Sequence, residues 1–458
     1  MIRWLETPLH RAYMIIGAMM LQTLYNGSIP LHPDEMYYWV WSRHLALSYY
    51  DHPGMIAYAI KFFSFLGDDA WVVRLPSVFA MGGVAWWCSA LAAEIFSARV
   101  AAWSLLLGLT LPAVAFGATL ATPDSVLLVF WGWGMFATYQ AFEHDRWRDF
   151  IQAGIALGCA MLSKYTAITF VMGLLVYGVI YHRSVLLQIK FWVAALIALV
   201  VVSPVMIWNA QHEWVSFAFQ YGHGTGEHLR ADYLGEYLGG ALVLLSPILF
   251  GIVARGMGSR SLWEFRQRAF VGVMVGVPFL FFGYKALFAR MQLNWYAMIC
   301  VGAVIIGAWM IVSRRWEKWG MASVAVSLLL GAIVKFPALF HLPAQANIHN
   351  RLFGYDRAVA LALEAKCPHE VLMADHLTIA AAMSYYAPGH PDVVIPFPTR
   401  MSQYSLWNSD HDRNQGGILL ATRTIDDPRA HLLTAFVVTQ EGMIDKQFYL
   451  YRVSAKVG

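Results

Sequence analysis

Three aspartates next to proline or histidine are the residues of this chain best suited to chemistry. Asp34 follows Pro33, Asp51 precedes a His-Pro pair, and Asp124 follows Pro123. A carboxylate in an apolar, aromatic cleft can have a raised pKa and act as a general base. The alternative for Asp34 and Asp124 is a purely structural role in capping the first turn of a helix.

The elements that carry these acids are predicted to be membrane helices. Hydrophobic residues make up 59% of the 458 residues, charged residues make up 13%, and the mean hydropathy is +0.52. Ordinary soluble proteins carry about 25% charged residues. A chain so poor in charge cannot cover a compact soluble surface, which excludes a soluble enzyme, a coiled coil and a disordered protein. The net charge of +4 is too small to indicate a nucleic-acid partner.

The apolar runs predict the number of membrane crossings. A helix needs about 20 mostly apolar residues to cross the hydrocarbon core. Runs of this kind predict about eleven transmembrane helices, near residues 12–30, 75–95, 100–118, 125–142, 150–163, 165–181, 191–209, 236–254, 269–287, 295–312 and 320–340.

Lysine and arginine in the short loops predict the orientation. With a cytoplasmic N-terminus, the cytoplasmic segments hold 14 positive charges and the opposite short loops hold 6. Cytoplasmic loops carry the excess of positive charge, so this orientation is favoured. The 14 charges are Arg3, Arg11, Arg99, Arg146, Arg148, Arg183, Lys190, Arg255, Arg260, Arg266, Arg268, Arg314, Arg315 and Lys318.

The last part of the chain, residues 345–458, differs in composition from the transmembrane domain predicted for residues 1–344. Its apolar runs are short and are separated by Pro, Gly and Asp, which is typical of strands. We expect strands near 371–373, 393–395, 418–420, 436–438 and 448–451, and a helix over 358–366. Eleven crossings place this small α/β domain outside the membrane. A disordered tail is the alternative, but the apolar content argues against it.

The predicted topology places all three aspartates on one side of the membrane. Asp34 and Asp51 lie in a long outer loop, residues 31–73, and Asp124 lies in the outer loop between the third and fourth spans. An ionisable group at membrane level is costly and is a functional candidate by default. We therefore expect the three acids to meet in one pocket.

The motifs around these acids resemble those of a known family. Asp34-Glu35-x-x-Tyr38-Trp39, Tyr49-Tyr50-Asp51-His52-Pro53, Arg74-Leu75-Pro76-Ser77 and Thr122-Pro123-Asp124 resemble motifs of the membrane-embedded GT-C glycosyltransferases. The chain is most similar to the branch that contains dolichyl-phosphate-mannose protein mannosyltransferases and bacterial lipid A aminoarabinose and galacturonic acid transferases. The resemblance spans roughly residues 30–300.

The resemblance implies a reaction and a location. A sugar on a polyprenyl phosphate would be transferred to an envelope acceptor: lipid A or its core, another glycolipid, a glycan or a protein. Multiple spans would anchor the enzyme in the bacterial cytoplasmic (inner) membrane, with the active site facing the periplasm. Asp34 would be the general base and Asp124 would support the site, with Glu35 beside Asp34. Asp51 and His223 would hold a divalent metal such as zinc, with His228 as the second choice of histidine, and no other cofactor is implied.

The contacts to the substrate are less well defined by the motifs. Some relatives have Arg where this chain has Tyr37, and Lys where it has His52. The expected phosphate contacts are therefore Arg74, Lys164, Lys285 and Arg290, with Arg74 and Arg290 preferred and a contribution from His52. Snorkelling at the end of a span is the alternative for each of the four Lys and Arg side chains. The aromatic residues expected to bind substrate are Tyr37, Tyr38 and Tyr50.

Two other classes of function compete with the enzyme. A transporter or flippase of lipid-linked glycans would carry ionisable groups near the bilayer midplane on repeated broken helices. Here the charges gather at span ends on one side, which favours the enzyme. A non-catalytic scaffold would leave the three aspartates without a purpose.

Overall fold

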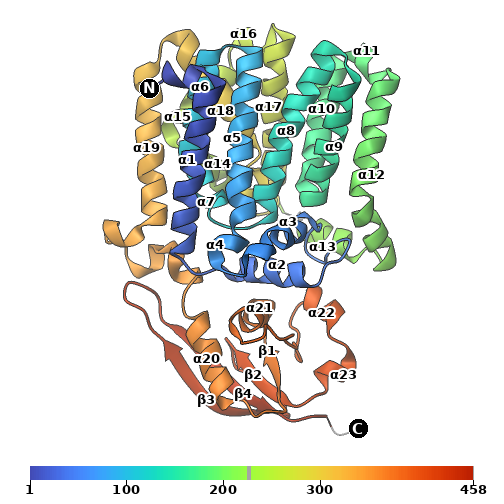
Figure 1. Cartoon of the computed structure of the whole chain (residues 1–458), viewed down its shortest axis with the longest axis vertical. Helices are drawn as coiled ribbons and strands as arrows, with labels where there is room; N and C mark the ends of the chain where they lie inside the picture. The colour runs from blue at the N-terminus through green and yellow to red at the C-terminus, as the bar shows by residue number, and fades with distance from the viewer. Residues whose placement is uncertain (224–227, 457–458) are drawn as a thin grey trace.

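The chain forms a body of long helices with a small sheet domain at one end (Figure 1). The computed structural model describes residues 1–223 and 228–456, and for His223 it describes the backbone only. The long helices of the body are α1 (Pro8–Gly27), α5 (Leu75–Ile95), α6 (Ala98–Thr110), α8 (Pro123–His144), α9 (Trp147–Ser163), α10 (Ile168–Tyr181), α12 (Ile189–Gln211), α14 (Ala231–Leu245), α15 (Pro247–Met257), α17 (Arg266–Lys285), α18 (Ile299–Arg314) and α19 (Glu317–Lys335).

Each predicted span falls on one of these helices or on a pair of them. Helices α14 and α15 are bent by 105° at Ser246, which has a left-handed φ and precedes Pro247. Pro247 has no backbone N–H and so cannot continue the hydrogen-bond ladder. Within the described residues, four helices are long and apolar enough to cross a membrane, or five with this bent pair. The total of eleven crossings stays a prediction.

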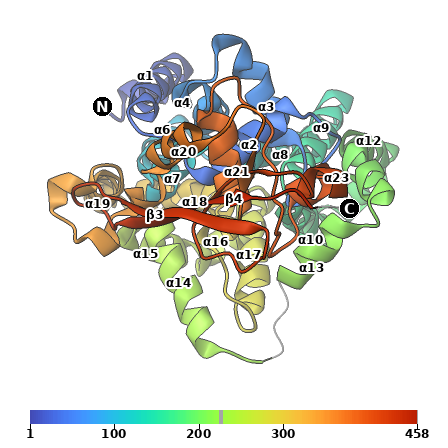
Figure 2. The same ribbon diagram turned by 90° about the horizontal axis from the view of Figure 1, so that it is seen from below.

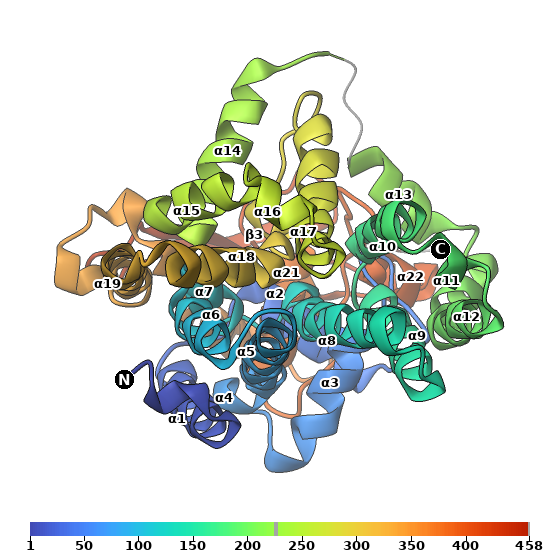
Figure 3. The same ribbon diagram turned by 90° about the horizontal axis from the view of Figure 1, so that it is seen from above.

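Helix α18 lies at the centre of the helical body, with α5, α6 and α17 around it (Figure 3). Nearly all of its residues are buried. Glycines allow the close approach of its neighbours: at Gly302 an added Cβ would lie 2.5 Å from Val275, and at Gly307 2.5 Å from Leu249. The core of the body is thus packed tightly, and the larger cavities lie at the end that faces the sheet domain.

The two ends of the helical body differ in charge, as the loops predict. The N-terminus, α11 (Arg183–Leu186) and α16 (Arg260–Trp263) lie at the end far from the sheet domain (Figure 1). These are segments of the predicted cytoplasmic set. The sheet domain lies at the opposite end, where the chain has fewer positive loops.

The first outer loop folds into short helices between the body and the sheet domain. These helices are α2 (Pro33–Arg43), α3 (Met55–Phe63) and α4 (Ala70–Val73). A capping box starts α2: the His32 ring accepts a hydrogen bond from the Asp34 amide, and Glu35 Oε2 accepts one from the His32 amide at 2.8 Å. Most of α2 is buried, because it packs against α21 (Leu377–Tyr386) of the sheet domain. The sheet domain therefore covers the loop that carries Asp34.

The sheet domain contains four strands in the order β1-β2-β4-β3. Strands β1 (Val371–Ala374) and β2 (Gly417–Ala421) are parallel, and β4 (Lys446–Val453) runs antiparallel to both β2 and β3 (Ala430–Val438). Helix α20 (Tyr355–Ala365) and α21 pack with this sheet. Figure 2 shows β3 and β4 crossing the lower end of the molecule.

The prediction of a strand at residues 393–395 is wrong. Val394 forms a single bridge to Met373, and the Ile395 amide donates to the Asn408 side chain. Pro391 and Pro396 flank this run, and proline cannot donate to a strand ladder. The run therefore pairs with β1 at Val394 alone and does not extend into a strand.

Candidate active site

A cavity of about 530 Å³ lies where the helical body, the first outer loop and the sheet domain meet. Its wall brings together residues from six parts of the chain. These include Asp34, Tyr37, Tyr38, Asp51, His52, Lys164, Gln220, Lys285, Trp295, Leu377 and Arg400. Two of the three aspartates thus border one cavity, and the third lies directly behind its wall.

Asp34 is the most open of the three acids. It lies on the first turn of α2, its side chain is 56% exposed, and it borders the cavity. Among the described residues, His32 is the nearest basic side chain, and its Nδ1 lies 3.6 Å from Asp34 Oδ2 and accepts a hydrogen bond from the Asp34 amide. A carboxylate that keeps this much freedom can accept a proton from a bound molecule.

Asp124 is held in place from two sides. Lys164 Nζ lies 2.5 Å from its Oδ1, and Asn294 Nδ2 donates to its Oδ2 at 2.9 Å. The Asp124 side chain is only 14% exposed. Lys164 has an extended backbone and lies between the end of α9 and the short helix that follows. This interruption of the helix lets its side chain reach Asp124. Lys164 therefore pairs with Asp124 and borders the cavity at the same time.

Asp51 is tied to both the first outer loop and the sheet domain. The Tyr37 hydroxyl donates to Asp51 Oδ2 at 2.8 Å and accepts from the Gln403 amide at 2.9 Å. Gln220 of α13 (Val215–His223) donates to the Asp51 carbonyl at 2.6 Å. Asp51 is largely buried. These bonds fix the floor of the cavity.

Tyr38 lies among all three acids. Burial, followed by the negative charges of Asp34, Asp51 and Asp124, raises the pKa of its hydroxyl well above the ordinary value. The hydroxyl therefore stays protonated over the physiological range. Asp34 and Asp51 both border the cavity, and the charges of these two acids and of Asp124 all act on the Tyr38 hydroxyl.

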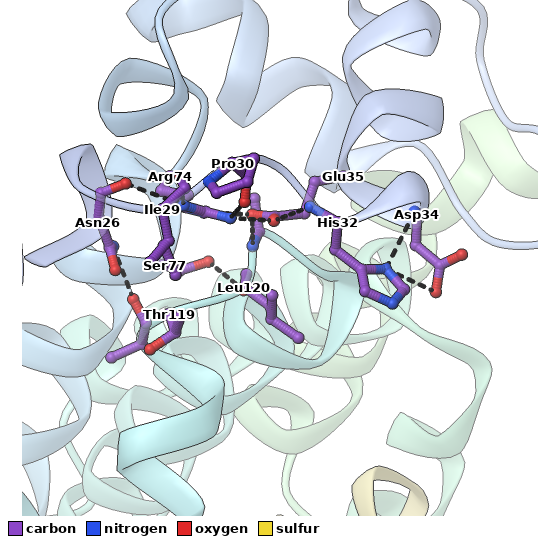
Figure 4. A network of polar contacts seen from close by, with 12 residues as sticks. Asn26, Ile29, Pro30, His32, Asp34, Glu35, Arg74, Ser77, Thr119 and Leu120 are labelled. Atoms are coloured by element: carbon purple, nitrogen blue, oxygen red, sulfur yellow. Dashed lines mark hydrogen bonds and ion pairs between the residues drawn. The ribbon is translucent and has the colours of Figure 1, made fainter. Parts of the chain in front are cut away.

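Glu35 and Arg74 form a separate, buried network next to this cavity (Figure 4). Both side chains are fully buried. Arg74 donates to Glu35 through Nε at 2.8 Å and through Nη2 at 2.6 Å. Its other bonds go to the backbone carbonyls of Asn26, Ile29 and Pro30.

The role expected of Glu35 and Arg74 must be revised. Neither residue borders the cavity, and Arg74 uses its guanidinium on Glu35 and on backbone carbonyls. Glu35 Oε1 also accepts from the amide of Ala121, three residues before Asp124. The pair therefore positions the first turn of α2 and the loop before α8, and it is not placed to bind phosphate or move a proton.

The chain resembles known glycosyltransferases. The family described as dolichyl-phosphate-mannose-protein mannosyltransferase matches residues 51–208. The lipid A galacturonosyltransferase RgtD of Rhizobium johnstonii is 25% identical over 369 residues, which cover 77% of this chain and 76% of the relative. The structure of ArnT from Cupriavidus metallidurans superposes with a TM-score of 0.70 at 15% identity, covering 96% of this chain and 97% of ArnT. The oligosaccharyltransferase of Archaeoglobus fulgidus gives a TM-score of 0.54 at 11% identity, with coverage of 88% and 68%.

The chain thus resembles glycosyltransferases in sequence and shares the fold of ArnT. The cavity at the end of the helical body is therefore the candidate active site of the glycosyltransferase. Asp34, on a short outer-loop helix, and Asp124, at the start of a long helix, supply its acids.

Two further predicted residues of the glycosyltransferase lie away from the cavity wall. The Arg290 side chain is 73% exposed and bonds to Glu236 at 2.6 Å. Tyr50 is buried, its ring lies against Phe219, and its amide donates to the Gln403 side chain at 2.8 Å. Arg290 therefore forms an ion pair with Glu236 at the surface. Tyr50 connects the first outer loop to the sheet domain.

The metal site predicted for the glycosyltransferase stays a prediction. The side chain of His223 lies outside the described residues. Among the residues that the structure describes, no three His, Cys, Asp or Glu side chains are grouped closely enough to hold a metal ion. Asp51 Oδ2 is already used by the Tyr37 hydroxyl.

Two residues of the sheet domain escaped the sequence analysis. Arg400 borders the cavity, and Gln403 bonds to both Tyr37 and Tyr50. Both residues follow the last helix of the body, far from the motifs around Asp34. Their local sequence, rich in proline and serine, contains no signal for a site.

Proposed function

We propose that the chain transfers a sugar from a polyprenyl-phosphate donor to lipid A or a related glycolipid, with Asp34 as the general base. One observation carries this proposal: Asp34 is open to the cavity while Asp124, behind the same wall, is held by Lys164 and Asn294. The relative RgtD is named a lipid A galacturonosyltransferase, and ArnT of Cupriavidus metallidurans has also been crystallised with undecaprenyl phosphate, in a form that gives a TM-score of 0.69 at 13% identity.

The reaction needs one base and no acid. The acceptor oxygen attacks the anomeric carbon, Asp34 takes the acceptor proton, and the bond between the anomeric carbon and the phosphate oxygen breaks. The electron pair of that bond leaves with the polyprenyl phosphate, which is already an anion. Attack opposite the leaving group inverts the anomeric centre. The leaving phosphate is stabilised by cations and does not require a proton donor.

The cations of the cavity wall suit the donor phosphate. Arg400 from the sheet domain and Lys285 from the end of α17 both border the cavity, as does His52. Arg400 presents a planar fork that can pair with two phosphate oxygens. It takes the part that Arg74 was expected to play. Lys164 and Asn294 hold the Asp124 carboxylate in place, so this second acid is suited to orient sugar hydroxyls.

The orientation of the enzyme follows from its charge. We infer eleven crossings, with the positively charged loops in the cytoplasm and the cavity and sheet domain in the periplasm. No nucleotide sugar is supplied outside the cytoplasm, so a lipid-linked donor is chemically reasonable there. The cavity lies at the membrane surface, where the phosphate of such a donor resides.

The test uses purified protein in nanodiscs with labelled polyprenyl-phosphate sugars and lipid A. Asp34→Asn should slow transfer by roughly 100- to 10,000-fold, the usual contribution of a positioned base. Asp410→Asn is the matched control, because Asp410 lies on α23 (Asp410–Arg413) with a side chain 95% exposed. Full turnover by Asp34→Asn removes Asp34 as the base. No transfer by the wild type from any lipid-linked sugar contradicts the proposed function.

A further inference from the structure

A second cavity, of about 470 Å³, lies beside the candidate active site. It is bordered by the end of α1, the segment around α7 (Pro112–Gly117), the end of α19 and residues 345–352. His32 borders this cavity, and Asp34, two residues further on, borders the first. His32 and Asp34 both lie at the start of α2 (Figure 4), so this end of the helix borders both spaces.

The second cavity is positively charged. Lys335 and Arg351 border it, together with His32 and His349, and none of its described lining residues is acidic. Within the described chain, neither Lys335 nor Arg351 forms an ion pair with a carboxylate. A space lined by two such cations and no acid attracts an anion.

Lys335 is held by a built polar network. Its Nζ lies 2.5 Å from Gln22 Oε1 and 4.8 Å from the centre of the Tyr25 ring. Gln22 is buried and donates to Asn26 Oδ1 at 2.8 Å. The Asn26 carbonyl accepts from Arg74 (Figure 4). The lysine therefore belongs to the same network that positions Glu35 and the start of α2.

The location points to a lipid as the source of the anion. Lys335 is the last residue of α19, one of the helices suited to cross a membrane. Large apolar side chains are exposed near it on both neighbouring segments: Leu21 and Leu24 on α1, and Phe336 and Leu339 after α19. Such side chains contact lipid at the edge of the bilayer, whereas a soluble anion would need no apolar surroundings.

We propose that the second cavity binds the phosphate of the acceptor headgroup, so that the acceptor reaches Asp34 past His32 while the donor occupies the first cavity. This inference rests on the proposed function for the identity of the acceptor. Arg351 offers the planar fork and Lys335 the point charge that phosphate recognition uses. The apolar side chains around Phe336 would receive the acyl chains.

The experiment measures binding separately from turnover. Wild-type protein in nanodiscs of neutral lipid is titrated with lipid A that carries its phosphates and with enzymatically dephosphorylated lipid A. The wild type should prefer the phosphorylated form by about 10-fold or more, which corresponds to one good charge-assisted contact. The double variant Lys335→Gln/Arg351→Gln should lose this preference. The matched control is Arg357→Gln/Lys366→Gln, since Arg357 and Lys366 lie outside both cavities, on and just after α20.

Each outcome decides between alternatives. A preference for the phosphorylated lipid that survives in the double variant overturns the proposal. If the double variant loses its thermal stability, Arg351→Gln alone replaces it, and a surviving preference there overturns the proposal in the same way. Equal binding of both lipids, with full competition by inorganic phosphate, shows a site for a free anion and also overturns it. A rise of the donor KM instead of the acceptor KM assigns the cations to the donor. Failure of wild-type transfer, with the lipid preference intact, contradicts only the proposed function.

Discussion

Asp34 and Glu35 are neighbours in the chain, but α2 places them in opposite surroundings. Asp34 is 56% exposed and borders the cavity, whereas Glu35 is fully buried and bonds to Arg74 through both carboxylate oxygens. Successive helical residues point about 100° apart, because a turn holds 3.6 residues. One acid is therefore free to accept a proton, and its neighbour is fixed in a structural pair.

The difference shows how a loop between two long helices can hold the carboxylate of Asp34 in a defined position. Glu35 joins the first turn of α2 to the amide of Ala121 and, through Arg74, to the end of α1. Asp34 and Asp124 are each attached to a segment that this pair holds. Groups held in advance need little rearrangement when charge develops during the reaction.

The largest expected effect comes from removing the partner of the buried acid, Glu35. Arg74→Gln leaves Glu35 as an unpaired buried charge, which costs roughly 3–5 kcal/mol of folding free energy. We expect a strong fall in the unfolding temperature, measured by fluorescence-detected size-exclusion chromatography after heating. Arg357→Gln, on the exposed side of α20, serves as the control. An unchanged unfolding temperature with a raised donor KM would return Arg74 to the phosphate site.

The next largest effect concerns the pair of Lys164 and Asp124 at the cavity. Lys164→Met removes the cation from Asp124, and we expect kcat to fall about 100-fold with little change in the unfolding temperature. Asp124→Asn should give a similar fall. The double variant should be no slower than either single variant, since the two residues act as a unit. Additive losses would contradict this view and give Lys164 an independent role at the phosphate.

A smaller effect concerns the connection between the cavity and the sheet domain. Tyr37→Phe removes a hydroxyl that bonds to Asp51 and to the Gln403 amide. Each lost bond is worth about 1 kcal/mol. Hydrogen exchange around residues 400–407 should accelerate, whereas Tyr13→Phe, on the exposed face of α1, should leave it unchanged. Unchanged exchange in Tyr37→Phe would show that other contacts hold the domain in place.

The smallest effect is a dependence of stability on pH. Burial is the main cause that lowers the pKa of His32, His349 and His376 below the ordinary value of 6.5. As the pH falls below that value, the unfolded chain takes up protons that the folded chain resists. These histidines therefore leave the free energy of unfolding undiminished above about pH 6.5, and they lower it in more acidic solution. The unfolding temperature at pH 5.5 should lie below that at pH 7.5, and His376→Gln should reduce the difference.

Much of this arrangement was predictable from the sequence, because its signals are long or one-sided. Apolar runs mark the long helices, and positive loops mark one end of the body, so the convergence of Asp34, Asp51 and Asp124 follows from topology. The bend at Ser246 was not predicted, since the apolar run continues through it.

The division of roles between Asp34 and Glu35 was not predictable. Both are carboxylic acids in the same motif, and they differ in role only because Glu35 is buried and Asp34 is exposed. The partner of Glu35, Arg74, was expected at the phosphate because arginine suits phosphate chemically as well as it suits a carboxylate. Arg400 and Gln403 come from a distant domain, so no spacing rule connects them with Asp34.

The position of Arg400 has a consequence for how such an enzyme can change. Asp34 and Asp124 belong to the helical part of the chain, while Arg400 of the cavity wall is supplied by the sheet domain. In the proposed function Arg400 pairs with the donor phosphate, so exchange of that domain alone would alter donor binding. Chimeras joined at the end of α19 would therefore exchange this donor contact together with the α21 surface that packs against α2 beside Asp34.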